Sequence, residues 1–231
     1  EISSPLTFIK ANQETFLFAY NKVKDHLTDP EAKKVFENFI LPGVKDSLSG
    51  IQRIEELLKS FRRFYKKEHK ISVNDIASII NEVKSLTYYG IKKGGINFSF
   101  DITDDSSNTI KCNRQELIQV LTNIVNNAID ALDEVRQENK ELKISVNPDG
   151  QYIKITVSNN GPSIPENIFD KIFNPFFTTK TEDKGTGLGL SIVYQIIKIM
   201  GGSVSAVNRS DGHDTVDFVL KLPVNQDPKD N

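Results

Sequence analysis

The chain has 231 residues, of which 38% are hydrophobic and 26% charged, with a formal net charge of −2. This composition is typical of a globular protein with one large or two modest domains, and the balanced charge argues against nucleic acid or a membrane surface as a partner. The single cysteine, Cys112, excludes an internal disulfide framework and favours a cytosolic setting. No membrane-spanning run or signal peptide is visible. Because the chain begins at Glu1 without methionine, we expect a fragment, with room upstream for a membrane anchor or sensor.

Two long amphipathic helices are predicted at residues 2–27 and 36–65, where apolar residues recur at three- and four-residue steps. Thr28-Asp29-Pro30 separates the two helices, and Pro42-Gly43 predicts a kink or break in the second. The result is a helical hairpin with two apolar stripes. The stripes are covered either by a second copy, in a four-helix bundle formed through residues 2–67, or by the rest of the same chain; we favour the homodimer.

A charged segment, residues 66–70, separates this hairpin from a part with mixed helices and strands. Asn113 with Glu116 forms a capping-box signature, and residues 147–150 read as a turn. Helices are predicted at 73–88, 113–136 and 190–200, and strands at 96–101, 143–146, 152–158, 203–207 and 215–222. We expect an α+β protein with a helical hairpin at 1–68, an α/β sandwich with helices on one face of a mixed sheet at 69–223, and a disordered tail at 224–231.

Asparagine is concentrated on one face of the helix predicted at 113–136. Asn123, Asn127 and Asp130 share that face, because residues 123 and 127 lie one turn apart. A solvated polar face is the simpler interpretation of any single asparagine. Several asparagines in one helix are less common, since asparagine is a mediocre helix former, and a neutral amide oxygen is a suitable ligand for Mg²⁺ beside phosphates.

Three further segments follow in order. Residues 158–165 form a Gly/Pro-rich turn at the end of a predicted strand, and residues 172–180 contain three phenylalanines, typical of a core or a lid, before Lys180. The run 185–190, Gly-Thr-Gly-Leu-Gly-Leu, then leads into a helix. By itself that run is as consistent with a flexible turn as with a phosphate-binding loop.

The order of these four segments resembles the N, G1, F and G2 boxes of sensor histidine kinases, over about residues 70–222. The resemblance implies the Bergerat-type ATP-binding fold that these kinases share with gyrase, the MutL repair proteins and heat-shock-protein-90-type chaperones. The form Phe-x-Pro-Phe-Phe-Thr-Thr-Lys at residues 173–180 is the kinase version of the lid.

The resemblance also implies roles for single residues. Asn127 matches the Mg²⁺ ligand, and Asn123 matches a residue that supports the metal or the phosphates. Asn159 stands where the family usually has an aspartate that accepts from the adenine amino group, and Ser163 stands where a second glycine is usual. The implied contacts with ATP and Mg²⁺ are Asn123, Asn127, Asp130, Asn159, Gly161, Ser163, Ile164, Phe176, Thr178, Thr179, Lys180, Gly185, Thr186, Gly187, Leu188, Gly189 and Leu190.

The resemblance extends to the hairpin, whose start, Glu1-Ile2-Ser3-Ser4-Pro5-Leu6, is similar to the segment after the phosphorylated histidine of nitrogen-regulator-type kinases. The phosphoacceptor histidine is then expected just before Glu1. Glu1 is implied as the general base for its imidazole, and an aspartate of a response regulator as the next acceptor. Ser4 occupies the position that orients water when relatives dephosphorylate that regulator.

Two other functions remain open from the sequence. A nucleotide-binding or scaffold protein without kinase activity is expected if the residue before Glu1 is not histidine. A chaperone- or gyrase-like ATPase is disfavoured by Asn123, because those enzymes have a glutamate there as general base for water.

Overall fold

The computed structural model describes residues 3–51, 54, 71–103, 109–135, 138–180, 185–210 and 214–224. The chain divides into two compact units, Glu1–Glu68 and His69–Asn231, which we describe one at a time. Four of the expectations fall outside the described residues: Glu1, the part of the second predicted helix after residue 54, the charged segment at 66–70 and the tail from residue 225.

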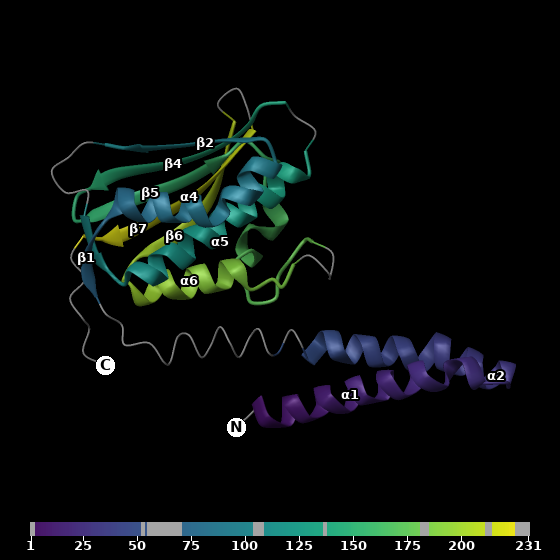
Figure 1. The fold of residues 1–231 in the computed structure, drawn as a ribbon. Coiled ribbons are helices and arrows are strands. Elements are labelled where there is room, and N and C mark those ends of the chain that lie inside the picture. The colour runs from purple at the N-terminus through teal and green to yellow at the C-terminus, as the bar shows by residue number, and fades with distance from the viewer. Residues whose placement is uncertain are drawn as a thin grey trace. The chain divides into compact units, whose positions relative to one another are not determined.

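The first unit contains a helical hairpin (Figure 1). Helix α1 (Ser3–Val23) ends in a 3-10 turn, η1 (Lys24–His26), so the helix predicted to residue 27 is shorter than expected. Asp29 then begins α2 (Pro30–Val35), and its side chain accepts from the Glu31 N–H at 3.0 Å. The two arms meet through aromatic rings, because Phe36 stacks on Phe16 and on Tyr20 with ring centroids 6.4 and 5.7 Å apart.

The sequence predicted a kink or a break at Pro42-Gly43, and the break is absent, because the helix continues through both residues. A π-helical turn, η2 (Phe36–Ile40), follows α2, and the chain is α-helical at 41–51. The N–H of Leu41 bonds to the carbonyl of Phe36, five residues earlier. A proline ring clashes with the carbonyl four residues before it in an α-helix, and the wider π turn immediately before Pro42 relieves that conflict.

The second unit is built on a five-stranded mixed sheet with the order β2-β4-β5-β7-β6 (Figure 1). The pair β2–β4 is parallel and the other pairs are antiparallel. A separate two-stranded antiparallel sheet pairs β1 with β3. The bounds are β1 (Ser72–Asp75), β2 (Ile96–Ile102), β3 (Thr109–Cys112), β4 (Lys140–Asp149), β5 (Tyr152–Asn159), β6 (Ser203–Ser210) and β7 (Asp214–Pro223).

Three helices cover one face of this sheet: α4 (Ile76–Lys93), α5 (Arg114–Asp133) and α6 (Gly189–Ile199) (Figure 1). Side chains alternate along each strand, so one set packs beneath the helices and the other faces outward. In β4 and β5 the inward set is fully buried at Leu142, Ile144 and Ile155, whereas Lys143 points away and pairs with Asp101 at 3.8 Å. The α/β sandwich expected from the sequence is therefore confirmed.

Several boundaries differ from the prediction. Residues 73–75 are strand, not helix, because Asp75 is the N-cap of α4 and accepts from the N–H groups of Ala77 and Ser78. Strand β4 continues through residue 149, so the turn to β5 is tighter than expected and centres on Gly150, with φ 64°. A 3-10 helix, η3 (Glu166–Lys171), follows the Gly/Pro-rich segment.

The predicted cap of α5 is present, since the Asn113 side chain accepts from the N–H groups of Gln115 and Glu116. No helix in the described part of the chain is both long enough and apolar enough to cross a membrane.

Candidate functional site

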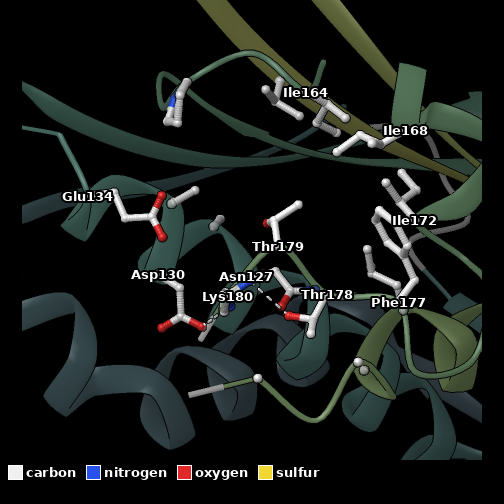
Figure 2. A pocket seen from close by; sticks show the side chains of 18 of the residues that line it. Asn127, Asp130, Glu134, Ile164, Ile168, Ile172, Phe177, Thr178, Thr179 and Lys180 are labelled. Atoms are coloured by element: carbon white, nitrogen blue, oxygen red, sulfur yellow. Dashed lines mark hydrogen bonds and ion pairs between the residues drawn. The ribbon is translucent and has the colours of Figure 1, made fainter. Parts of the chain in front are cut away.

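A pocket of about 510 Å³ opens between α5, the end of β5 and the segment that runs from η3 to the start of α6 (Figure 2). Strand β7 supplies two apolar side chains, Val216 and Phe218. The described residues that line the pocket are Asn127, Ala128, Asp130, Ala131, Glu134, Asn159, Pro162, Ser163, Ile164, Pro165, Ile168, Ile172, Phe177, Thr178, Thr179, Lys180, Gly185, Thr186, Gly187, Gly189, Leu190, Val216 and Phe218.

One part of the pocket is apolar. Figure 2 shows Ile164, Ile168, Ile172 and Phe177 on the same side of it. Ile164 is held at its backbone: its N–H donates to Asn208 Oδ1 at 3.0 Å, and its carbonyl accepts from Asn208 Nδ2 at 2.8 Å. This clamp matters because Asn208 lies opposite Val216 in the β6–β7 pair, so it fixes the loop over the sheet.

Asn159 is the single buried polar side chain among the described lining residues, with 3% of its surface exposed. Its Oδ1 accepts the Gly161 N–H at 3.0 Å, and its Nδ2 donates to the Val216 carbonyl at 3.4 Å. Because the Gly161 N–H is a donor and the Val216 carbonyl is an acceptor, the side-chain oxygen of Asn159 faces Gly161 and its nitrogen faces Val216. A Cβ at Gly161 would come within 2.7 Å of Asn159 Oδ1, so glycine is required there to leave room for the amide.

The other part of the pocket is polar and carries charges. Lys180 Nζ forms an ion pair with Asp130 Oδ2 at 2.5 Å, which joins the segment after η3 to α5 (Figure 2). The Lys180 N–H also donates to Thr178 Oγ1 at 3.1 Å. Asn127 and Glu134 line the same region, one turn before and one turn after Asp130. The pocket therefore combines an apolar half with a half that offers a cation, hydroxyls and amides.

The glycine run forms the wall beside these groups. Gly187 has φ 65°, and a Cβ there would overlap the backbone of Phe176. A Cβ at Gly185 would overlap Thr178 Oγ1. Gly189 is different, because a Cβ there would meet only Asn127 Nδ2, at 3.9 Å. Two of the three glycines are thus required by the protein's own packing, whereas the third leaves open space next to Asn127.

Most of the residues expected from the sequence line this pocket. Of those that do not, Asn123 lies behind it and donates from Nδ2 to the Gly189 carbonyl at 3.3 Å, which supports the start of α6. Gly161, Phe176 and Leu188 neighbour lining residues: Gly161 supports Asn159, Phe176 contacts Gly187, and buried Leu188 is the N-cap of α6. Ser4 belongs to α1, its side chain is outside the described residues, and Glu1 is not described.

The apolar side of the pocket was only partly anticipated from the sequence, and the two hydrogen bonds between Asn208 and the Ile164 backbone were not anticipated. Ile172 and Phe177 line the pocket but were named only as parts of the possible lid at 172–180, and three more lining residues were not singled out: Ile168, Val216 and Phe218. Alternation in β7 was a usable signal for the last two, because it places residues 216 and 218 on the face that the helices cover.

The residues of the pocket fit a magnesium ion whose coordinating oxygens come mostly from water and from the phosphates of a bound molecule, with few from the protein. Among the described residues, no three or more His, Cys, Asp and Glu side chains gather into a metal cluster. Mg²⁺ keeps several waters and needs few protein oxygens when phosphates supply others. Asn127, on the polar side of the pocket and beside the space at Gly189, is a suitable single donor.

The geometry defines a class of protein: an ATP-binding domain with a sandwich of helices on a mixed sheet and a glycine loop at the start of a helix. Residues 112–226 match the family described as histidine kinase-, DNA gyrase B- and HSP90-like ATPase. The solved catalytic domain of the histidine kinase ThkA is 36% identical, with a TM-score of 0.58, and the match covers 67% of this chain and 96% of that one. The chain belongs to the sensor histidine kinase family.

Curated relatives extend the similarity towards the N-terminus. The sensor histidine kinase ZraS of Escherichia coli K12 is 30% identical over 77% of this chain and 37% of its own length. The sensor protein FixL of Bradyrhizobium diazoefficiens is 26% identical over 95% of this chain and 41% of its own length. The chain thus spans about two fifths or less of these relatives. A structure of ThkA in complex with the response regulator TrrA is 29% identical, with a TM-score of 0.62, and the match covers all of this chain and 63% of that one.

Proposed function

We propose that the chain is the catalytic core of a two-component sensor histidine kinase, which transfers the γ-phosphate of ATP to a histidine just before Glu1. The observation that carries this proposal is the division of the pocket into an apolar half with one buried amide, Asn159, and a polar half with Lys180 and Asn127. A purine nucleotide has the same division between its base and its phosphates.

In this proposal the base lies over Val216 and Phe218 and meets Asn159, while the phosphates lie between Lys180 and the glycine run. Asn127 holds Mg²⁺, which when bound neutralises phosphate charge in the transition state. The loop N–H groups and Lys180 add to that stabilisation, because they are aimed at the developing charge before the reaction. Asn123 supports the glycine run through its hydrogen bond to the Gly189 carbonyl.

The transfer itself uses groups at the start of the first unit. Glu1 accepts the proton of one imidazole nitrogen as the other nitrogen attacks the γ-phosphorus, and the bond from that phosphorus to the bridging oxygen breaks so that ADP leaves. The phosphoryl group then passes from the histidine to an aspartate of a response-regulator receiver domain. Ser4 orients the water that hydrolyses this aspartyl phosphate and releases inorganic phosphate. The similarity to ThkA, whose solved complex contains a response regulator, supports this partner.

The hairpin is proposed to form a homodimer through residues 2–67. Large apolar side chains are exposed on its described part: Phe8 by 71%, Phe18 by 62% and Phe39 by 73%. A hairpin has too few neighbours to cover such side chains, and a four-helix bundle of two copies covers them. We place this core in the cytoplasm, without direct contact with a membrane.

Labelled ATP tests the proposal directly. The protein with its natural upstream residue, incubated with Mg²⁺ and γ-labelled ATP, is expected to acquire label that is acid-labile and alkali-stable, as phosphohistidine is. Asn127→Ala should abolish labelling, whereas Asn126→Ala, an exposed neighbour outside the pocket lining, should not. Nucleotide binding without any label would support a kinase-inactive relative instead.

A further inference from the structure

We infer that Asn159 makes the base subsite permissive, so that the pocket binds 6-amino and 6-oxo purine triphosphates with similar affinity. This inference rests on the proposed nucleotide function and assigns a specificity-determining role to one side chain.

An asparagine amide offers two N–H donors and two acceptor lone pairs. In the structure, one lone pair of Asn159 is used by the Gly161 N–H and one N–H by the Val216 carbonyl. These two bonds leave one donor and one acceptor of this lining residue for a bound base. Both hydrogen-bond partners, the Gly161 N–H and the Val216 carbonyl, are backbone groups. They fix the orientation of the amide, so its remaining donor and acceptor keep their positions.

The two kinds of purine differ in what they require. The 6-amino group of adenine donates, and the spare lone pair of Asn159 can accept from it. The 6-oxo group of hypoxanthine or guanine accepts, and the spare N–H of Asn159 can donate to it. A carboxylate at this position would offer acceptors only and would reject the 6-oxo group, since two acceptors would face each other in a buried site.

Among the described residues that line the pocket, Asn159 is the one buried polar side chain available to bond the 6-substituent of a purine. The neighbours Val216, Phe218 and Ala131 are apolar and contact a purine face without regard to its substituents. Discrimination therefore depends on Asn159 and on main-chain groups around it.

The decisive measurement compares ATP with ITP, which differ only at the 6-position and the adjoining ring nitrogen. Dissociation constants for the full chain, measured by calorimetry with Mg²⁺, are expected to agree within about tenfold. A preference for ATP above roughly tenfold would overturn the inference and leave the proposed function intact. Binding of neither nucleotide would overturn both. This comparison needs no variant, so it is independent of any effect of mutation on folding.

A variant then assigns the effect to the side chain. Asn159→Asp is expected to weaken ITP by at least about tenfold relative to ATP. The matched control is Asn160→Asp, which adds the same charge one residue away, where the amide bonds to the Glu141 N–H and the Asn139 carbonyl outside the pocket lining. An unchanged ATP-to-ITP ratio in folded Asn159→Asp would contradict the assignment.

Discussion

Single residues in the glycine run have different reasons to be glycine. At Gly187 the positive φ and the nearness of the Phe176 backbone both exclude a side chain. At Gly189 the backbone is helical and the space beside it is open towards Asn127. Packing within the protein therefore requires glycine at Gly187, whereas at Gly189 a requirement for glycine would come from a bound ligand.

Alanine at these two positions should therefore give different results. Gly187→Ala is expected to destabilise the loop by at least about 1–2 kcal/mol, because a left-handed residue and a steric overlap are combined. Gly189→Ala should leave the melting temperature nearly unchanged and still weaken ATP binding roughly tenfold, since its Cβ occupies the proposed phosphate space. Thermal unfolding and calorimetry of both variants check this. Full ATP affinity in Gly189→Ala would argue against phosphates at that position.

Cys112 supplies a prediction on pH. Burial raises the pKa of its thiol from 9.0 to about 11, against a smaller lowering by the hydrogen bond from Asn74. The unfolded thiol loses its proton above about pH 9, whereas the folded thiol keeps it to about pH 11, so the unfolded state binds fewer protons in this window. The free energy of unfolding should then be unaffected below pH 9 and fall by roughly 2–3 kcal/mol towards pH 11.

Denaturant unfolding between pH 8 and 11 measures that slope. Cys112→Ala is the control: it removes the thiol and with it this part of the slope, while tyrosines and lysines still titrate. Equal slopes in the two proteins would show that the thiol makes no contribution.

The residues of the site divide into those a sequence can reveal and those it cannot. Asn127, Asn159 and Lys180 stand in short ordered segments, and the structure brings all three to one pocket. Asn208 could not be found this way, because its role is to bond the backbone of Ile164, 44 residues earlier. A long-range side chain to backbone bond leaves no local pattern.

At the scale of elements, an ion pair between Lys180 and Asp130 connects the segment after η3 to α5. Both partners line the pocket, so in the proposed nucleotide site the carboxylate would compete with the phosphates for the same ammonium group. The pair is partly exposed, and its own contribution to stability is therefore small.

Asp130→Asn should raise the affinity for ATP roughly three- to tenfold, because it frees Lys180 and removes a negative charge beside the phosphates. Lys180→Met should lower it. The comparison is best made by calorimetry at two salt concentrations, since screening reduces both effects. Asp133→Asn, on the same helix and exposed outside the pocket lining, is the control for charge. A lower ATP affinity in Asp130→Asn would show that the carboxylate binds the nucleotide directly or through its metal.

The elements themselves were predictable to different degrees. Long helices and the strands of the large sheet were found, because each has a sustained apolar period. Strands β1 and β3 were missed, since each has four residues and their pairing joins Ser72 to Cys112 across forty positions. The residue types at Val73–Asp75 do not favour a strand over a helix. The N-cap at Asp75 fixes the start of α4 at Ile76, so these residues belong to β1.

At the scale of the whole molecule, the hairpin unit is expected to set the oligomeric state. Phe39→Asp should convert a dimer into a monomer with the 26.0 kDa mass of one chain, because it places a charge in the proposed apolar interface. Light scattering after size-exclusion chromatography measures this. Asn38→Asp, exposed on the adjacent position, should remain a dimer. A monomeric parent protein at micromolar concentration would contradict the proposed bundle.

The π-helical turn before Pro42 affects the direction in which side chains of the second hairpin helix point around its axis. The half-buried positions at residues 32, 36, 40, 44 and 48 repeat at four-residue steps. In a regular α-helix, which turns about 100° per residue, each such step drifts by about 40°, and the row would wind off the contact face. A π turn contains one additional residue, which takes back most of that accumulated rotation. Deleting one residue from Phe36–Ile40 should therefore restore α-helical spacing and leave the following side chains near their present direction, whereas deleting one residue from the α-helical stretch 41–51 should turn the side chains that follow it by about 100°, away from their present neighbours.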